Sequence, residues 1–177
     1  MNHSKRRAAV RIGLGAVLLL LLGAVFVLNF PFPVSREISA LEISLDDPSY
    51  RNEVHVSISG TLYLSLFEDS YLEGQFSVDA YPQTADGTFH GLSLRSAGRS
   101  LLTYKYPVST NPSGTHEYRG WALGQIFYQD GFSHAVILVA PEEDSTGQTC
   151  IVFDVQTRQE ALDAMEKSGA GCYLAGR

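Results

Sequence analysis

The sequence predicts a mainly β protein, in which an N-terminal transmembrane helix precedes an antiparallel β-sandwich or partly open barrel with one C-terminal α-helix. Three observations lead to this fold class. Residues 12–30 form an apolar run without charge, apolar and polar side chains alternate over long parts of the remaining chain, and one stretch near the C-terminus has helical spacing. The chain has 177 residues, so about 140 remain beyond the run, enough for one domain.

The apolar run is long enough to cross a bilayer. At about 1.5 Å per residue, a helix over 12–30 covers roughly 28 Å, close to the ~30 Å hydrocarbon core of a membrane. The first 11 positions hold four basic residues, and the first acidic residue is Glu37, a distribution that keeps the N-terminus in the cytoplasm. A cleaved signal peptide is the alternative, but the run is longer than the apolar region of such peptides and lacks a clear cleavage site.

We therefore expect a single-pass membrane protein with four parts. They are a basic cytoplasmic tail at 1–11, a transmembrane helix at 12–30, a Pro-containing juncture at 31–36 and an extracytoplasmic β-rich domain at 37–177. The formal net charge of the whole chain is −6; without the four basic residues of the tail, nine basic residues face 19 acidic ones, a net charge of −10. An acidic domain without a basic patch argues against nucleic acid as a partner.

The clearest pattern in the outer part predicts a long β-hairpin. Apolar residues occupy even positions and polar residues odd positions over 54–66, and the phase holds across Gly60. The same phase resumes over 72–80, so a loop around 69–71 keeps both apolar sets on one face. Gly60 is expected to be a bend or a bulge in the first strand.

The other expected strands are short and separated by turn residues. They cover 88–94, 101–106, 117–128, 132–140 and 149–155, and 36–45 is either a first strand or a continuation of the stalk after the membrane helix. Asp130-Gly131 is a two-residue hairpin signal between two of them. The stretch 135–140 is apolar on both faces, so we expect that strand to be central and covered on both sides.

One helix is expected outside the membrane. Thr157 and Glu160 form a capping box, apolar residues follow at helical spacing, and Gly169 suits the position after the helix end. This helix is expected to cover one face of the sheet. A short final strand is expected at 172–175.

The two cysteines, Cys150 and Cys172, both fall on the expected outer side. In an oxidising compartment they would form one disulfide that closes a loop of about 20 residues, worth on the order of 3 kcal/mol. Two separate buried thiols are the alternative, and the spacing leaves both open. Since no two outer histidines or cysteines have metal-ligand spacing, we expect no metal site and no cofactor.

Catalytic motifs are absent from the sequence. There is no Gly-x-Ser-x-Gly and no Ser-x-x-Lys, so neither common pattern of a serine nucleophile is present. We interpret His134 as a hydrogen-bonded residue in or near the core and His55 as a solvent-facing strand residue. In the expected hairpin register, Asp79 lies opposite Thr61 and Glu73 lies opposite Phe67. The two carboxylates are therefore separated along one strand, which argues against a carboxylate pair for glycoside hydrolysis.

Aromatic residues around the hairpins are the remaining candidates for a binding site. If they point outward they form a platform for a peptide, a sugar or a partner protein, and if they point inward they belong to the core. The candidate binding residues are Tyr63, Tyr81, Tyr118, Trp121 and Tyr128.

These features favour a non-enzymatic, membrane-anchored outer domain that binds a protein or another envelope ligand, with the lipid bilayer as its partner through the N-terminal helix. Two alternatives stay open: an envelope hydrolase whose site is assembled only in the fold, and a structural or assembly subunit of a membrane complex. A structure that places His55, His90 or His116 beside a carboxylate and a hydroxyl in a cleft would favour the hydrolase.

Overall fold

The structure, a computed structural model, describes residues 13–20, 23, 30–65, 69–94, 98–110, 116–128, 132, 134–141 and 147–173. The strands are β1 (Phe30–Ser44), β2 (Arg51–Leu64), β3 (Ser70–Val78), β4 (Thr88–Phe89), β5 (Leu92–Leu94), β6 (Arg99–Thr110), β7 (His116–Phe127), β8 (Val136–Val139) and β9 (Thr149–Phe153). The helices that follow β1 are α2 (Gln83–Asp86), α3 (Arg158–Lys167) and the 3-10 helix η2 (Ala170–Tyr173). The fold is mainly β and antiparallel, as predicted.

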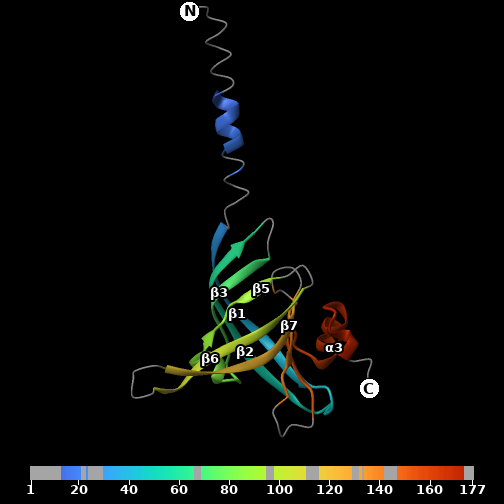
Figure 1. Cartoon of the computed structure of the whole chain (residues 1–177). Helices are drawn as coiled ribbons and strands as arrows, with labels where there is room; N and C mark the ends of the chain where they lie inside the picture. Colours follow the sequence, from blue (N-terminus) through green and yellow to red (C-terminus); the bar gives the residue numbers. More distant parts are fainter. Residues whose placement is uncertain are drawn as a thin grey trace, which may run out of the picture.

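The strands form one curled sheet with the shape of a half-barrel (Figure 1). Their order is β4-β6-β7-β8-β9-β1-β2-β3-β5. The short stretch expected as one strand at 88–94 is divided at His90 and Gly91 into β4 and β5, which pair with opposite edges of the sheet: β4 with β6, and β5 with β3. This segment therefore connects the two edges of the sheet, which curves back on itself toward a closed barrel.

Hydrogen bonds from tyrosines also cross between the two edges. The Tyr104 hydroxyl of β6 donates to the Phe76 carbonyl of β3 at 2.7 Å, and the Tyr128 hydroxyl donates to the Ser93 carbonyl of β5 at 3.3 Å. Both tyrosines are buried, so the two bonds satisfy polar groups that would otherwise be costly inside the barrel.

Two apolar clusters hold the fold together. The larger fills the concave side of the sheet and includes Val56, Ile58, Phe76, Tyr104, Leu123 and Ile137. The smaller lies on the outer side beneath α3 and includes Leu41, Ile43, Val136, Val152 and Met165. All four residues of β8 are buried, which confirms a strand covered on both sides, and Figure 1 shows α3 as the cover on the outer face.

Helix α3 begins as its sequence predicts. The Thr157 side chain accepts a hydrogen bond from the Glu160 amide, and the Glu160 carboxylate accepts from the amides of Gln156 and Thr157. Gly169 follows the helix end with a positive φ of 85°. A final strand was expected at 172–175. Residues 172 and 173 belong to η2 instead, and residues 174 and 175 lie outside the described residues.

The β2–β3 hairpin has the predicted common face but a different register. Thr61 pairs with Glu73 rather than with Asp79, so the strands are displaced by six residues from the expected alignment. An even displacement keeps every side chain on its face, which is why Val54, Val56, Phe76 and Val78 are all buried. The loop accordingly precedes β3, which begins at Ser70, instead of lying at 69–71.

Gly60 is not a bulge, because β2 keeps a continuous register with both β1 and β3. It lies opposite Gly74, with φ values of 153° and 149°. A Cβ on Gly60 would meet the Glu73 carbonyl oxygen at 2.1 Å, and one on Gly74 would meet that of Ser59 at 2.2 Å. The pair of glycines therefore permits a close approach of two backbones.

The N-terminal part departs from the expected layout at its end. Residues 31–36, expected as a juncture, continue β1 and pair with β2, with Pro31 opposite Tyr63 and Pro33 opposite Thr61. Residues 13–20 are helical, but nine of the 19 residues of the expected span at 12–30 lie outside the described residues. Within the described part of the chain, no helix has both the length and the apolar character to cross a membrane.

The other strands differ from expectation mainly in length. β6 continues through Pro107 to Thr110, with an irregular register between Pro107 and Ser109. The expected two-residue turn at Asp130-Gly131 lies outside the described residues, but eight residues separate the end of β7 from the start of β8, so a two-residue hairpin is wrong.

Candidate functional site

A buried carboxylate lies on the concave face of the sheet, near the turn between β1 and β2. Glu42 is 3% exposed. Its Oε2 accepts hydrogen bonds from the Tyr50 hydroxyl and from Asn52 Nδ2, both at 3.0 Å, and its Oε1 accepts from the Tyr81 hydroxyl. Asn52 is the register partner of Glu42, whereas Tyr81 comes from beyond the end of β3.

This Glu42 cluster (Glu42, Tyr50, Asn52 and Tyr81) is closed rather than reactive. Both carboxylate oxygens are occupied by donors, so the buried charge is compensated in the way that makes such burial tolerable. Burial raises the pKa of Tyr50, and the neighbouring Glu42 carboxylate raises it further, so the phenol remains a donor. The cluster ties the end of β3 to β1 and β2.

A second group of polar side chains lies on the opposite face of the same strands, around a hollow of about 380 Å³. His55 Nδ1 and Asp79 Oδ2 are 3.2 Å apart, and the His55 amide donates to Asp79 Oδ1 at 2.9 Å. Ser57 and Ser77 face each other across β2 and β3 and also line the hollow. We call this group, with Glu37 at its border, the His55 hollow.

The His55 hollow has parts of a catalytic arrangement but lacks the decisive contact. A carboxylate on one imidazole nitrogen orients the ring for general-base chemistry. However, the described hydrogen bonds of His55 all go to Asp79, and none joins it to Ser57 or Ser77. The side chains of His55 and Asp79 are 75% and 53% exposed, so water competes for both of them.

The third candidate is an extended pair of strands that we call the β6–β7 ribbon, residues 105–110 and 116–121. Four consecutive residues of β7, 117–120, are exposed, so neither face of this strand is covered there. Among the described residues, β8 pairs with β7 only over 124–127, and β4 pairs with β6 only at 104 and 105. Figure 1 shows the two strands projecting away from α3.

Apolar side chains are exposed on this ribbon. Val108 is 61% exposed and Tyr118 is 58% exposed. At the base of the ribbon, Tyr106 donates a hydrogen bond to the Gln83 carbonyl at 2.7 Å, and Trp121 packs against Tyr104 with ring centroids 5.7 Å apart. The ribbon is therefore fixed to the barrel at its base and accessible along its length.

The structure does not bring the five candidate aromatic residues together. Tyr118 is exposed on the ribbon, and Trp121 is half-buried at its base. Tyr63 stacks on Tyr71 at the far end of the β2–β3 hairpin, with centroids 4.5 Å apart. Tyr81 belongs to the Glu42 cluster and Tyr128 is buried in the core, so these two residues do not share a surface with the exposed Tyr118.

The two cysteines are both free. Cys150 is buried beneath α3, with its Sγ 3.4 Å from the Met165 sulfur, whereas Cys172 is exposed in η2. The disulfide is therefore not formed, and the alternative of two buried thiols holds only for Cys150. Burial raises the pKa of the Cys150 thiol to about 12.

Sequence reasoning missed the Glu42 cluster and the partner of His55. Glu42 follows Ile38 and Ala40 at the two-residue spacing of one strand face, and this apolar face was an available signal for the burial of Glu42. Its partners could not be read from the sequence because they come from separate turns. The His55–Asp79 pair was missed because the expected register of β2 and β3 was wrong. His134 was expected in or near the core, but it is exposed.

Comparison with protein-family models, with curated proteins and with solved structures gave no match. The described residues hold no group of three or more His, Cys, Asp or Glu side chains suited to a metal ion. The function must therefore be argued from the surfaces of this chain alone.

Proposed function

We propose that this protein is a single-pass, membrane-anchored β-domain outside the cytoplasm that binds another protein of the cell envelope through the β6–β7 ribbon. The observation that carries the proposal is the projecting ribbon itself. A two-stranded hairpin without further support is at best marginally stable in water. An extended ribbon that exposes Val108 and Tyr118 instead of burying them is typical of a surface used for contact.

The ribbon offers a partner two kinds of interaction. Its open strand edges present backbone donors and acceptors to which an extended segment of another protein can add. Val108 and Tyr118 supply apolar area, and a tyrosine is among the residues that contribute most to binding energy at interfaces. The ribbon itself carries Lys105, Glu117 and Arg119, a formal net charge of +1, so a partner with a neutral or acidic contact surface suits it.

The membrane anchor rests on the sequence. The uncharged run at 12–30 has the length of a transmembrane helix, and the basic residues before it favour a cytoplasmic N-terminus. With this topology the whole sheet lies on the outer side. An anchored domain that binds one partner also accommodates the assembly-subunit alternative, in which the partner is a neighbouring subunit.

Site-specific photo-crosslinking in membranes of the native host tests the proposal. A photoreactive amino acid replaces Tyr118 on the ribbon in one variant and Tyr173 in the control variant. Tyr173 is an exposed aromatic residue of η2, away from the ribbon, and is 43% exposed. We expect a discrete crosslinked protein from position 118 and none from position 173, while equal products or none from 118 would contradict the proposal.

A hydrolase is the second candidate, because the His55 hollow places a histidine beside a carboxylate with two serines nearby. Activity would require Ser57 or Ser77 to approach the free nitrogen of His55 when substrate binds. A serine-reactive phosphonate probe tests this reading directly. Labelling that disappears in Ser57→Ala or Ser77→Ala and in His55→Asn would favour the hydrolase, and absence of labelling would exclude a nucleophilic serine here.

A further inference from the structure

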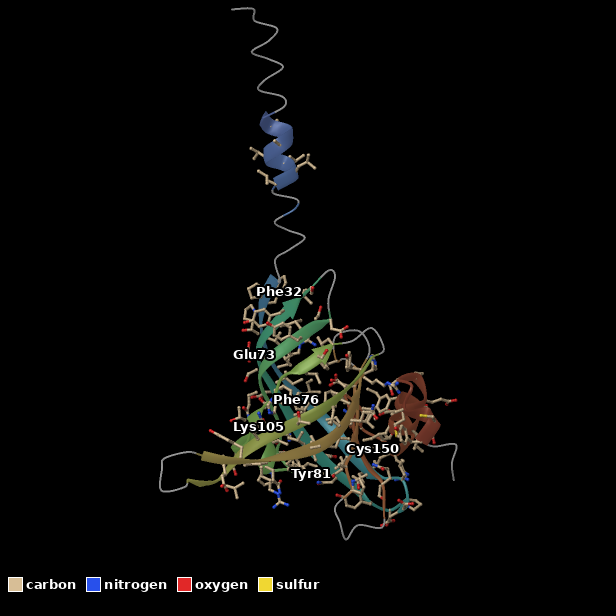
Figure 2. The ribbon with its side chains drawn as sticks, viewed as in Figure 1. Phe32, Glu73, Phe76, Tyr81, Lys105 and Cys150 are labelled. Carbon is tan, nitrogen blue, oxygen red and sulfur yellow. The ribbon has the colours of Figure 1, made fainter. Side chains whose placement is uncertain are left out.

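Apolar residues from three strands gather at the end of the sheet where β1 begins and where β2 turns into β3. Phe32 is 47% exposed, Leu64 is 42% exposed and Tyr71 is 38% exposed. Register brings them to the same end of the sheet, because Phe32 pairs with Leu62, and Tyr63 pairs with Tyr71. Figure 2 shows Phe32 at this end, beyond Glu73. We call Phe32, Tyr63, Leu64 and Tyr71 the sheet tip.

The sheet tip is apolar on both faces. Phe32 and Leu64 have the phase of the concave side, whereas Tyr63 and Tyr71 have the phase of the outer side and stack on each other. The described residues 30–35, 61–65 and 70–72 carry no charge. Exposed aromatic and aliphatic groups on both faces of a strand end are unusual for a surface that meets only water.

The position of the tip in the chain identifies what covers it. β1 begins at Phe30, the last residue of the uncharged run at 12–30. At about 3.3 Å per residue, Phe32 lies within roughly 7 Å of the end of the run, a distance similar to the depth of the headgroup layer of a bilayer. No spacer separates the sheet from the run, so a run that spans the membrane brings the tip to its surface.

We propose that the sheet tip inserts into the headgroup region of the membrane and holds the domain in a fixed orientation on it. This inference rests on the proposed anchor and goes beyond it, because the anchor alone would leave the domain free to tilt. Aromatic side chains are enriched at this depth, where a ring can be buried while its hydroxyl stays hydrated. Tyr63 and Tyr71 have this character, and Phe32 and Leu64 add apolar area.

The contact is expected to be apolar rather than electrostatic. The charged residues nearest the tip include Asp69 and Glu73, both exposed and both acidic. They disfavour attraction to anionic lipids, so vesicles of zwitterionic phosphatidylcholine are the proper probe. Addition of anionic lipid is expected to leave the insertion unchanged or to weaken it.

Fluorescence quenching by lipid in vesicles tests the insertion. The full chain is reconstituted in phosphatidylcholine, with Trp121→Phe as the background and one new tryptophan by Tyr71→Trp. Phe32→Trp is the second variant, in case the first disturbs the Tyr63 stack, and Tyr173→Trp is the control. With lipid brominated near the ester groups, we expect about twofold quenching at positions 71 and 32 and none at position 173.

Vesicle flotation of the same samples separates the possible failures. If the protein floats with the vesicles but quenching at positions 71 and 32 is no stronger than at 173, the anchor stands and the insertion of the tip is wrong. If the protein does not float, the proposed anchor fails, and the inference about the tip fails with it.

Discussion

Among the described residues, Glu42 is the one charged side chain that is buried. Its hydrogen bonds with Tyr50, Asn52 and Tyr81 involve an ionised acceptor, and such bonds are stronger than neutral ones. We expect Glu42→Ala to lower the free energy of unfolding by about 2 kcal/mol, because three donors lose their acceptor. Water can replace the acceptor for Tyr50 and Asn52, which are exposed, and this offsets only part of the loss.

Urea denaturation of the chain in mild detergent measures this loss. Glu53→Ala is the matched control, since Glu53 is an exposed glutamate whose ion pair with Arg51 at 3.1 Å is solvated. Its removal is expected to cost less than about 0.5 kcal/mol. Equal losses for the two variants would show that the Glu42 cluster does not stabilise the fold.

The two cysteines are expected to differ sharply in reactivity. The raised pKa of Cys150 keeps its thiol protonated near neutral pH, and the thiolate is the reactive form. Burial beneath α3 also blocks access, whereas Cys172 is exposed. At about pH 8 an aromatic disulfide reagent should therefore modify Cys172 in the native protein and Cys150 only after unfolding. Rapid reaction of both thiols would mean that α3 does not cover the sheet in solution.

At the scale of elements, the start of α3 depends on one ionised carboxylate. Hydrogen bonds from the amides of Gln156 and Thr157 lower the pKa of Glu160 below its ordinary value of 4.5. A lowered pKa in the folded state stabilises the protein above that ordinary value, and this contribution is lost as the pH falls through the folded pKa. We therefore expect Glu160→Gln to lower the melting temperature at about pH 7 and to lower it less at about pH 3.

Thermal unfolding at the two pH values measures this difference, with Glu166→Gln as the control on the same helix. Glu166 is also exposed, but it lies outside the capping box. An effect of Glu160→Gln that persists unchanged at low pH would show that the ionised carboxylate is not what stabilises the helix start.

The glycine pair of the long hairpin is the second element with a measurable consequence. A methyl group on Gly74 would overlap the Ser59 carbonyl oxygen, and the φ of 149° is itself unfavourable for alanine. Gly74→Ala is expected to destabilise the fold by more than about 2 kcal/mol. Gly120→Ala on the ribbon meets no atom within 4 Å and should change stability by less than about 0.5 kcal/mol. Similar urea midpoints for both variants would contradict the close approach of β2 and β3.

At the scale of the whole molecule, the sheet separates three surfaces. The sheet tip lies at one end of β1, and the Glu42 cluster lies near the other. The 15 residues of β1 cover roughly 45 Å at about 3.3 Å per residue. The β6–β7 ribbon projects from the side opposite α3 (Figure 1). A tip fixed at the bilayer would therefore present the ribbon well away from the lipid, where a partner can reach it.

Features set by local sequence were predicted well. The alternation of β2 and β3 identified the buried face, and the capping box of Thr157 and Glu160 identified α3. The apolar stretch around β8 correctly indicated a strand covered on both sides, because a strand that is buried on both faces has apolar side chains at successive positions.

Features that depend on contacts between distant segments were not predicted. Register was wrong by six residues because an even displacement leaves the alternation unchanged, and this error hid the pairing of His55 with Asp79. The partners of Glu42 and the bridge formed by β4 and β5 arise from turns and edges that have no local signature. The β6–β7 ribbon was underestimated because Pro107 was read as the end of a strand.

The most direct test is to determine on which side of the membrane the domain lies. Cys172 is a natural site for labelling in this test. Cys172 is exposed in η2, whereas Cys150 is buried and serves as an internal silent thiol. Intact cells of the native host are briefly reduced and then treated with a membrane-impermeant maleimide, with Cys172→Ser as the blank. We predict that Cys172 is labelled in intact cells. Labelling only after the membrane is permeabilised would contradict an extracytoplasmic domain.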